Sequence, residues 1–433
     1  MSRPNILYLH SHDTGRYIEP YGYPVPTPNL QALAEGGVVF RNCFCTNPTC
    51  SASRAALLTG MCPHSSGMLG LAHRGWPLYD YSKHIVHTLR DKANYHTALC
   101  GVQHVARDAT VIGYDEIVMV GGPAAQVAPP AVDYLHSGPK QPFFLSVGFS
   151  DTHRVFSEPG PDEDPRWSRP PDPILDTPET RRDMAGFKAS ARELDVGMGR
   201  VLDALDEAGL ADNTLVICTA DHGIAFPYMK CNLTVGGCGV MLIVRGPGGF
   251  EGGLVNDALV SHVDLFPTLC DLLEIEPPPW LQGTSLMPLI RGEADEVNEQ
   301  VYTEVTYHAA YEPMRSVRTK RFNYVRRYGE RAAKVILPNC DDSTTKTLWL
   351  EHGWRERPVA PEQLYDLMFD PHEAHNLVDA PRYADALADL RGRLDRWMQQ
   401  TDDPLLKGDV PALEGAKVNN PDGISPQEPV QDA

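Results

Sequence analysis

Residues 4–15 read PNILYLHSHDTG, an apolar run that passes directly into a polar cluster. Consecutive apolar residues at 6–9, bounded by Pro4, are typical of a strand that is buried on both faces. The polar residues that follow are of the kinds that bind ligands and metals. The stretch therefore predicts a buried strand that ends in a functional loop.

The same pattern returns along the chain, and helical segments alternate with it. Further apolar runs lie at 38–40, 143–149, 214–219 and 240–244. Segments of helical composition lie at 29–36, 185–208 and 263–273. An apolar stripe along the longest of them comprises Leu194, Val196, Met198, Val201, Leu202 and Leu205. This alternation predicts an α/β fold with a large, mostly parallel sheet flanked by helices, and ligand chemistry at the carboxyl ends of its strands.

The pattern changes in the last third of the chain. Shorter extended runs at 301–304, 314–317 and 322–325 predict a smaller α+β subdomain with an antiparallel sheet, followed by a helix at 383–400. The final residues are rich in Pro, Asp and Gly, which is typical of an extended surface tail. The predicted regions are a catalytic α/β domain at 1–300, the sheet and helix at 301–403, and the tail at 404–433.

The composition limits the partners of the protein. Its 433 residues carry a formal net charge of −19 at pH 7, with a pI of about 5.2. A nucleic-acid surface needs clustered Lys and Arg, so we expect no nucleic-acid partner. No run approaches the ~18 apolar residues of a membrane span, so we expect no membrane association either. No apolar leader with a cleavage site follows Met1, which favours a cytoplasmic location, and an oligomer stays open.

Two short polar pairs follow predicted strands. His12-Asp13 and Asp221-His222 each offer one nitrogen and one oxygen ligand. Either pair alone is more often structural than metal-binding. Because the carboxyl ends of neighbouring parallel strands meet at one edge of a sheet, the two pairs together predict a four-ligand site for a divalent cation.

Cys50 is distinguished from the other cysteines by its neighbours. The chain has ten cysteines and no CxxC pair, which argues against structural zinc. Cys50 opens the run CSASR, and residues 53–59 have helical composition closed by Gly60. This places Cys50 at or next to a helix N-terminus, where free N–H groups and the helix dipole stabilise a developing anion. A buried, inert thiol is the alternative interpretation.

These residues resemble the type I sulfatases of the alkaline phosphatase superfamily. The signature of that family is Cys or Ser, any residue, Pro or sometimes Ala, any residue, Arg, and then Leu-Thr-Gly. This chain has Cys50, Ala52, Arg54 and the tripeptide at 58–60. Further matches lie at 4–7, 27–34, 261–268 and 364–377. Among sulfatases, the sequence is most similar to the sulfamidase branch, the heparan N-sulfatases, on the basis of short matches at 151–154, 223–227 and 314–317.

The resemblance implies an alkaline-phosphatase-like fold and a metal-dependent sulfatase. Its substrate would be an anionic sulfate ester or sulfamate, with saccharides included. A formylglycine-generating enzyme would oxidise Cys50 to formylglycine, whose hydrate is the nucleophile. One hydroxyl of the hydrate attacks sulfur, and the other then loses a proton as sulfate leaves. One divalent metal ion lowers the pKa of the attacking hydroxyl.

The resemblance also implies individual roles. Arg54 would hold the hydrate oxygen beside the metal. His104 would assist the release of sulfate, and His153 and Lys230 would contact the sulfate and serve the leaving group. The implied metal ligands are His12, Asp13, residue 50 itself, Asp221 and His222.

Three positions depart from the family pattern. His12 stands where the first of two adjacent Asp is usual, and His222 where Asn is usual. Imidazoles in place of oxygen donors shift the expected metal towards Mn, Zn or Fe, with Ca and Mg still open. If His12 points elsewhere, a cage of three residues remains. Val102 stands where the family has a sulfate-binding Lys, and Arg74 or Arg154 is the candidate to replace that charge.

Two other functions are compatible with the same residues. A phosphonate monoester or phosphodiester hydrolase of the superfamily would use the same machinery. A non-catalytic binder that retains the fold is favoured only by Val102. Kinetics on matched sulfate, sulfamate and phosphonate esters would separate the first from a sulfatase. Intact Cys50 in inactive protein from the native host would support the second.

Overall fold

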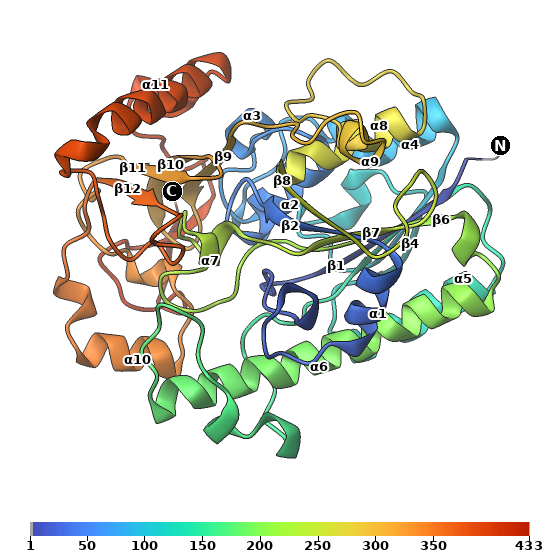
Figure 1. Ribbon diagram of the computed structural model, residues 1–433, viewed down its shortest axis with the longest axis horizontal. Coiled ribbons are helices and arrows are strands. Elements are labelled where there is room, and N and C mark those ends of the chain that lie inside the picture. Colours follow the sequence, from blue (N-terminus) through green and yellow to red (C-terminus); the bar gives the residue numbers. More distant parts are fainter. Residues whose placement is uncertain (1–2, 433) are drawn as a thin grey trace.

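An eight-stranded sheet lies between two layers of helices (Figure 1). Its strand order is β4-β3-β5-β1-β6-β7-β2-β8. Only β7 runs antiparallel to its neighbours, and the other pairs are parallel. The structure is a computed structural model that describes residues 3–432. Residues 1 and 2 of the predicted catalytic domain and residue 433 of the predicted tail lie outside the described residues.

The elements alternate along the chain as predicted. The strands of the large sheet are β1 (Asn5–Ser11), β2 (Val38–Phe44), β3 (His96–Gly101), β4 (Glu116–Val120), β5 (Phe143–Gly148), β6 (Thr214–Ala220), β7 (Leu242–Arg245) and β8 (Leu254–Ser261). The helices up to residue 300 are α1 (Pro28–Gly36), α2 (Cys50–Thr59), α3 (Pro63–Ser66), α4 (Ile85–Ala93), α5 (Ala124–His136), α6 (Pro178–Glu207), α7 (Val235–Cys238), α8 (Leu265–Leu272) and α9 (Met287–Ile290). The predicted α/β class with a mostly parallel sheet is confirmed.

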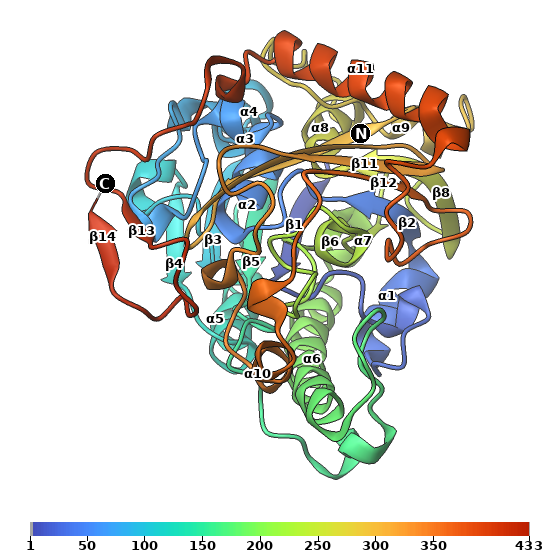
Figure 2. The same cartoon turned by 90° about the vertical axis from the view of Figure 1, so that its left-hand side faces the viewer.

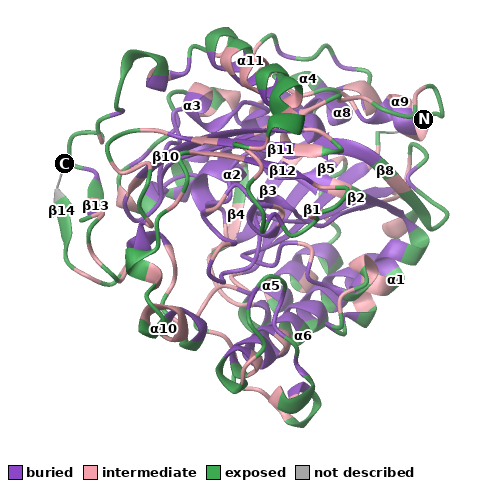
Figure 3. Ribbon diagram, turned by 60° about the vertical axis from the view of Figure 1, so that its left-hand side comes forward, coloured by how far each residue is buried: buried purple, intermediate pink, exposed green. Residues whose placement is uncertain are grey.

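Each face of the sheet is covered by its own helices, and the strands between the two edge strands β4 and β8 are buried along most of their length (Figure 3). Helices α1, α5 and α6 cover one face with side chains such as Leu33, Val127 and Leu194. Helices α2, α4 and α8 cover the other, where Leu58 and Leu269 join the core. Burial on both faces explains why these strands read as continuous apolar runs instead of alternating ones.

A four-stranded antiparallel sheet follows, in the order β12-β11-β10-β9 (Figure 2). Its strands are β9 (Val301–Tyr307), β10 (Tyr311–Arg318), β11 (Phe322–Arg327) and β12 (Glu362–Asp366). The remaining elements are α10 (Thr344–Glu351), α11 (Ala384–Gln400) and the hairpin strands β13 (Lys417–Asn419) and β14 (Val430–Asp432). Val317 of β10 and Leu390 of α11 belong to the same core cluster as Leu58 of α2. The two sheets therefore share one apolar core, and the region boundaries stay a prediction.

Three details differ from the expectations. The long helix α6 begins at Pro178, earlier than predicted, because Pro favours the first helical position and the Thr177 side chain caps the helix. Val196 is 52% exposed, so it does not belong to the stripe that its neighbours form. The predicted tail is not wholly extended, since Leu405 and Ala416 are buried and β13 pairs with β14. Among the described residues, no helix is both long enough and apolar enough to cross a membrane.

Four neighbouring strands deliver polar side chains to one edge of the large sheet. The sheet order places β3, β5, β1 and β6 side by side, and all four are parallel. The segments that leave their carboxyl ends carry His104, His153, His12-Asp13 and Asp221-His222 respectively. The fold therefore positions the site, because parallel strands end at a common edge.

A buried network of charges joins α3 to the antiparallel sheet. The His64 Nδ1 atom lies 2.7 Å from Glu304 Oε2, and the His64 backbone N–H donates to Glu304 Oε1 over 2.9 Å. Arg315 Nε lies 3.1 Å from Glu304 Oε2 and 2.5 Å from Asp403 Oδ2. Cys62 lies close enough to complete a metal-ligand group with His64 and Glu304. Arg315 and protonated His64 together balance the charges of Glu304 and Asp403, so the network is satisfied as an ion-pair cluster.

We expect His64→Gln to destabilise the protein by about 3 kcal/mol, the cost of breaking a buried ion pair. Burial alone would lower the pKa of His64, but Glu304 outweighs it and holds the pKa well above the ordinary 6.5. The folded state therefore retains the His64 proton more strongly than the unfolded state. The difference in the free energy of unfolding between wild type and variant should have its maximum value below pH 6.5. It should shrink as the pH rises through the pKa of His64 in the folded state.

Urea unfolding of both proteins across this pH range measures the difference. His375→Gln serves as the control, because its side chain is 83% exposed and contributes little. A stability difference that grows with rising pH would contradict the assigned protonation of His64.

Candidate active site

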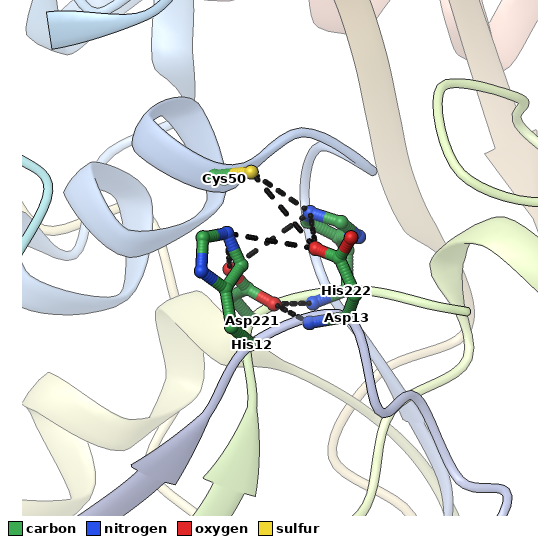
Figure 4. Close-up of side chains that lie close together, drawn as sticks. All are labelled: His12, Asp13, Cys50, Asp221 and His222. Atoms are coloured by element: carbon green, nitrogen blue, oxygen red, sulfur yellow. Dashed lines mark hydrogen bonds and ion pairs between the residues drawn. The ribbon is translucent and has the colours of Figure 1, made fainter. Parts of the chain in front are cut away.

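Five buried residues converge at the carboxyl edge of the large sheet (Figure 4). They are His12, Asp13, Cys50, Asp221 and His222, and one ligand atom from each lies within 4.8 Å of the others. His12 Nε2 lies 3.5 Å from Asp13 Oδ1 and 3.4 Å from Asp221 Oδ2. His222 Nε2 lies 3.1 Å from Asp13 Oδ1 and 3.3 Å from Cys50 Sγ. The structure thus brings together both predicted pairs and the predicted nucleophile precursor.

Two backbone features fix the carboxylates. Asp13 adopts a left-handed conformation with φ 58°, which short polar side chains tolerate better than most. The backbone N–H groups of Asp13 and His222 both donate to Asp221 Oδ1 over 2.9 Å. The other oxygen of Asp221 is therefore the one that faces the cluster. A Cβ at Gly15 would lie 3.0 Å from the Gly223 Cα atom. Glycine at position 15 therefore allows the segment after β1 to approach the segment after β6.

The donor set fits a divalent cation. His222 Nδ1 lies 2.9 Å from the Gly223 carbonyl oxygen, so it carries the proton and leaves a lone pair on Nε2. That lone pair faces a carboxylate oxygen, an arrangement that is repulsive unless a cation lies between them. His12 Nε2 is buried without a hydrogen-bond partner and also faces two carboxylates. Burial lowers the pKa of His12 well below its ordinary value, so its imidazole is neutral, as a ligand must be.

Cys50 is the first residue of α2 and is 2% exposed. Burial raises the pKa of its thiol well above the ordinary value; the positive charge of Lys230 opposes this, and Asp13 adds to it. A nucleophilic cysteine needs a lowered pKa, because the thiolate is the reactive form. In these surroundings burial therefore favours the protonated form of the Cys50 thiol.

Arg54 lies one helical turn after Cys50, on the same face of α2. Its Nη2 donates to Asp221 Oδ2 over 2.9 Å and to the Ser11 carbonyl over 2.8 Å. Its Nη1 lies 2.5 Å from His10 Nδ1. Arg54 is thus fully buried and held from both sides beside the cluster.

Lys230 also contacts the cluster, through the Asp13 carboxylate. Its Nζ lies 2.7 Å from Asp13 Oδ2, 2.9 Å from Asp341 Oδ2 and 3.4 Å from His153 Nε2. Burial would lower the pKa of Lys230, but Asp13 and Asp341 outweigh it and hold the pKa well above its usual range. Lys230 is therefore a fixed positive charge, and His153 lies next to it as predicted.

The structure adds residues that the sequence interpretation missed. Asp341 and His308 reach the site from the C-terminal region, and His10 and His73 contact Arg54 and His104. His10 lies in the polar cluster that follows the first apolar run, so the sequence carried a weak signal for it. No pattern in the sequence links the other three to the strand ends.

Arg74 and Arg154 are the candidates to replace the cation that is absent at Val102, and both are hydrogen-bonded to other groups. The Arg154 guanidinium is paired with Asp183, and its Nε donates to the Ala225 carbonyl. Arg74 donates to the Ala309 carbonyl and to Asn419. Both guanidinium groups thus have partners outside the cluster, and Arg154 also lines the cavity that opens beside it. That one of them replaces the charge stays a prediction.

A cavity of about 610 Å³ opens beside the cluster. Its lining includes His12, Val102, His104 and His153. The other lining residues are Gln103, Val120, Gly121, Gly122, Pro123, Ser150, Asp151, Arg154, Val155, Ser157, Ser190 and Glu193. A volume in this range accommodates a molecule of several tens of atoms at most, such as a sugar. The cavity therefore gives a substrate access to the imidazole side of the cluster.

Comparisons with known proteins show which family the chain belongs to. The family model described as Sulfatase matches residues 4–275, and that described as N-sulphoglucosamine sulphohydrolase, C-terminal, matches 235–349. The N-sulphoglucosamine sulphohydrolase of Homo sapiens is 32% identical over 463 residues, which cover 93% of this chain and 91% of that protein. An ulvan-active sulfatase of Formosa agariphila is 27% identical over 92% of this chain and 75% of its own.

A solved structure in complex with its substrate D-glucosamine-2-N,6-O-disulfate shares the fold. It has a TM-score of 0.74 and 19% identity over 93% of this chain and 99% of that chain. The fold is that of the alkaline-phosphatase-like class. Within that class, the chain belongs to the sulfatase family, whose members hydrolyse sulfuric esters or sulfamates. The predicted resemblance to sulfatases and to their sulfamidase branch is confirmed.

Proposed function

We propose that the protein is a metal-dependent sulfatase that hydrolyses the sulfate ester or sulfamate of a saccharide. Its nucleophile would be a formylglycine hydrate formed from Cys50. The observation that carries the proposal is the buried cluster in which Cys50, at the N-terminus of α2, faces two carboxylates and two imidazoles. The high pKa of the thiol supports a modified residue 50 over the thiol itself.

The residues of the cluster would bind the metal ion and orient the nucleophile. His12, Asp13, Asp221 and His222 would hold a divalent cation together with residue 50. The cation supplies the positive charge that favours a deprotonated oxygen nucleophile at neutral pH. The two imidazoles shift the preference of the site towards Mn, Zn or Fe, with Ca and Mg still open. Arg54, fixed by Asp221, would orient the oxygen of residue 50 that attacks sulfur.

The remaining residues would serve the sulfuryl group and the leaving group. Lys230 would offset negative charge on the sulfuryl oxygens, and its fixed position means that no reorganisation is needed during the reaction. His153, next to Lys230 and open to the cavity, would donate a proton to the departing alcohol or amine. His104 would accept a proton when sulfate leaves residue 50.

The substrate class follows from the cavity and the relatives. The cavity is large enough for a monosaccharide leaving group and lies on the side of His104 and His153. The human relative that covers most of the chain is named for the hydrolysis of N-sulphoglucosamine, which favours an N-sulfated amino sugar as the first substrate to test. Maturation would require a formylglycine-generating enzyme that acts on the unfolded chain, because Cys50 is buried after folding.

A substrate panel tests the proposal. We expect converted protein to hydrolyse N-sulfoglucosamine or an O-sulfated sugar with a higher kcat/KM than a phosphonate monoester or phosphodiester matched in leaving group. The alternative reading, a phosphonate or phosphodiester hydrolase, predicts the reverse order. No turnover of any ester by fully converted, metal-loaded protein would favour a non-catalytic binder.

A further inference from the structure

His104 lines the cavity beside the cluster and has an unusual backbone conformation. Its φ is 55°, in the left-handed region that non-glycine residues seldom adopt. Its ring stands at 62° to that of His12, with the ring centroids 5.8 Å apart. Its Nδ1 atom is buried and has no hydrogen-bond partner. Strained residues of this kind persist only where the surroundings hold them, so the contacts of the His104 ring are informative.

The holding contact comes from His73. The Nδ1 atom of His73 lies 2.9 Å from Nε2 of His104, and the two rings stack with centroids 5.1 Å apart and planes at 13°. His104 is half-buried, whereas His73 is exposed to solvent. One nitrogen of each ring is engaged in this contact, and the second nitrogen of His104, Nδ1, is buried without a hydrogen-bond partner.

The turn that carries His73 is anchored to the catalytic helix. His73 lies in a short 3-10 helix, Ala72–Arg74. The Ala72 backbone N–H donates to Ser51 Oγ over 3.0 Å, and Ser51 is the neighbour of Cys50. On the other side, Arg74 donates to Asn419 Oδ1 over 2.6 Å. The position of the His73 ring is thus set by the same helix that presents residue 50.

The protonation pattern of the pair follows from the contacts of the ring nitrogens. Nε2 of His104 lies against Nδ1 of His73, whereas Nδ1 of His104 is buried without a partner. A buried N–H without a partner is rarer than a buried acceptor without one. The bare nitrogen is therefore Nδ1, and the Nε2–H of His104 donates to His73 Nδ1. The remaining proton of His73 lies on Nε2.

We propose that His73 is a positioning residue that holds His104 with its bare Nδ1 directed at residue 50 for the release of sulfate. The proposal rests on the function proposed above. During release, a hydroxyl proton of residue 50 passes to the Nδ1 lone pair and the oxygen's electrons form a carbonyl. The bond to the departing sulfate oxygen breaks with both its electrons. A ring free to rotate or to change tautomer would present an N–H there and could not accept the proton.

The first test needs neither metal nor conversion of Cys50. Imidazole nitrogen NMR of the metal-free protein, labelled at histidine, reports which nitrogen of His104 carries the proton, and His104→Ala assigns the signal. We expect the Nε2–H form in wild type and in His73→Asn, whose side-chain oxygen keeps an acceptor near the place of Nδ1. His73→Ala should give a mixture of both forms. An Nδ1–H form in wild type would overturn the proposal.

The second test separates the two halves of the reaction on converted enzyme with para-nitrophenyl sulfate. Because His73 acts on release only, His73→Ala should lower kcat by about tenfold to a hundredfold and leave kcat/KM unchanged. It should also show a burst of nitrophenol in the first turnover. His73→Asn should behave like wild type. His375→Ala, at an exposed histidine away from the site, is the control for histidine loss.

The outcomes distinguish the role of His73 from the proposed function. If His104→Ala shows the burst and lowered kcat but His73→Ala does not, the role of His73 is wrong and the proposed function stands. If His104→Ala shows no burst and lowers kcat and kcat/KM equally, the assignment of release to His104 is wrong, and the role of His73 falls with it. The proposed function stands in that case as long as the wild type hydrolyses the sulfate ester, and it falls if converted, metal-loaded wild type does not. Parallel loss of kcat and kcat/KM in His73→Ala alone would show a merely structural role.

Discussion

Asp13→Asn should abolish metal binding and lower kcat/KM by on the order of 10³, through lost stabilisation of charge in the transition state. Asp13 is central because its two oxygens serve two partners. Oδ1 faces His222 and Cys50, and Oδ2 lies 2.7 Å from Lys230 Nζ. The Asn amide keeps the shape and one oxygen but loses the charge that attracts the cation. Metal content of the purified variant and its kinetics on a sulfate ester measure the two effects together.

Asp195→Asn is the matched control. Asp195 is also a buried carboxylate, and it accepts hydrogen bonds from the backbone of Asn29 and Leu30 at the start of α1. Its replacement should lower stability by about 1–2 kcal/mol, the cost of a lost helix cap, and leave metal content unchanged. Full metal occupancy and activity in Asp13→Asn would show that the cluster is not a metal site.

Lys230→Met should lower kcat/KM by about 10²–10³, the cost of removing one fixed charge that offsets a developing anion. The substitution should also destabilise the protein by about 3–5 kcal/mol. The reason for the second effect is that Asp13 and Asp341 would be left buried beside each other without their shared cation. Thermal unfolding of the metal-free protein and kinetics of the loaded protein measure the two effects separately.

The double variant Lys230→Met with Asp341→Asn distinguishes stability from catalysis. Removing the second carboxylate relieves the repulsion, so much of the lost stability should return. Activity should stay low, because the charge on the sulfuryl group is still missing. Recovery of activity in the double variant would mean that Lys230 acts only as the structural partner of Asp341.

The sequence was sufficient to predict the sheet and most of the site. The apolar runs at 6–9 and 214–219 predict buried parallel strands. The carboxyl ends of parallel strands meet at one edge of the sheet. Both metal-ligand pairs could therefore be predicted to lie together. Cys50 could be placed at a helix N-terminus because Gly60 closes a helix of the right length. His12 turns into the cluster, which the sequence left open.

The contributions of distant segments could not be predicted. Asp341 follows a short turn and His308 follows β9, and neither segment carries a pattern that relates it to the strand ends. Their approach depends on how the antiparallel sheet packs on the large one, which is a property of the shared core. His73 is likewise placed by a bond to Ser51, and a three-residue turn has no signature for such a contact. Tertiary packing, not local pattern, decides these positions.

The central claim is that residue 50 acts as formylglycine. Mass spectrometry of the peptide that contains Cys50, from protein produced with a formylglycine-generating enzyme, tests it most directly. We predict that sulfur and two hydrogens are replaced by one oxygen, that aminooxy reagents label this residue, and that activity rises in proportion to the converted fraction. Cys50→Ala should be unlabelled and inactive. A fully active preparation in which every peptide carries an intact Cys50 would contradict the account.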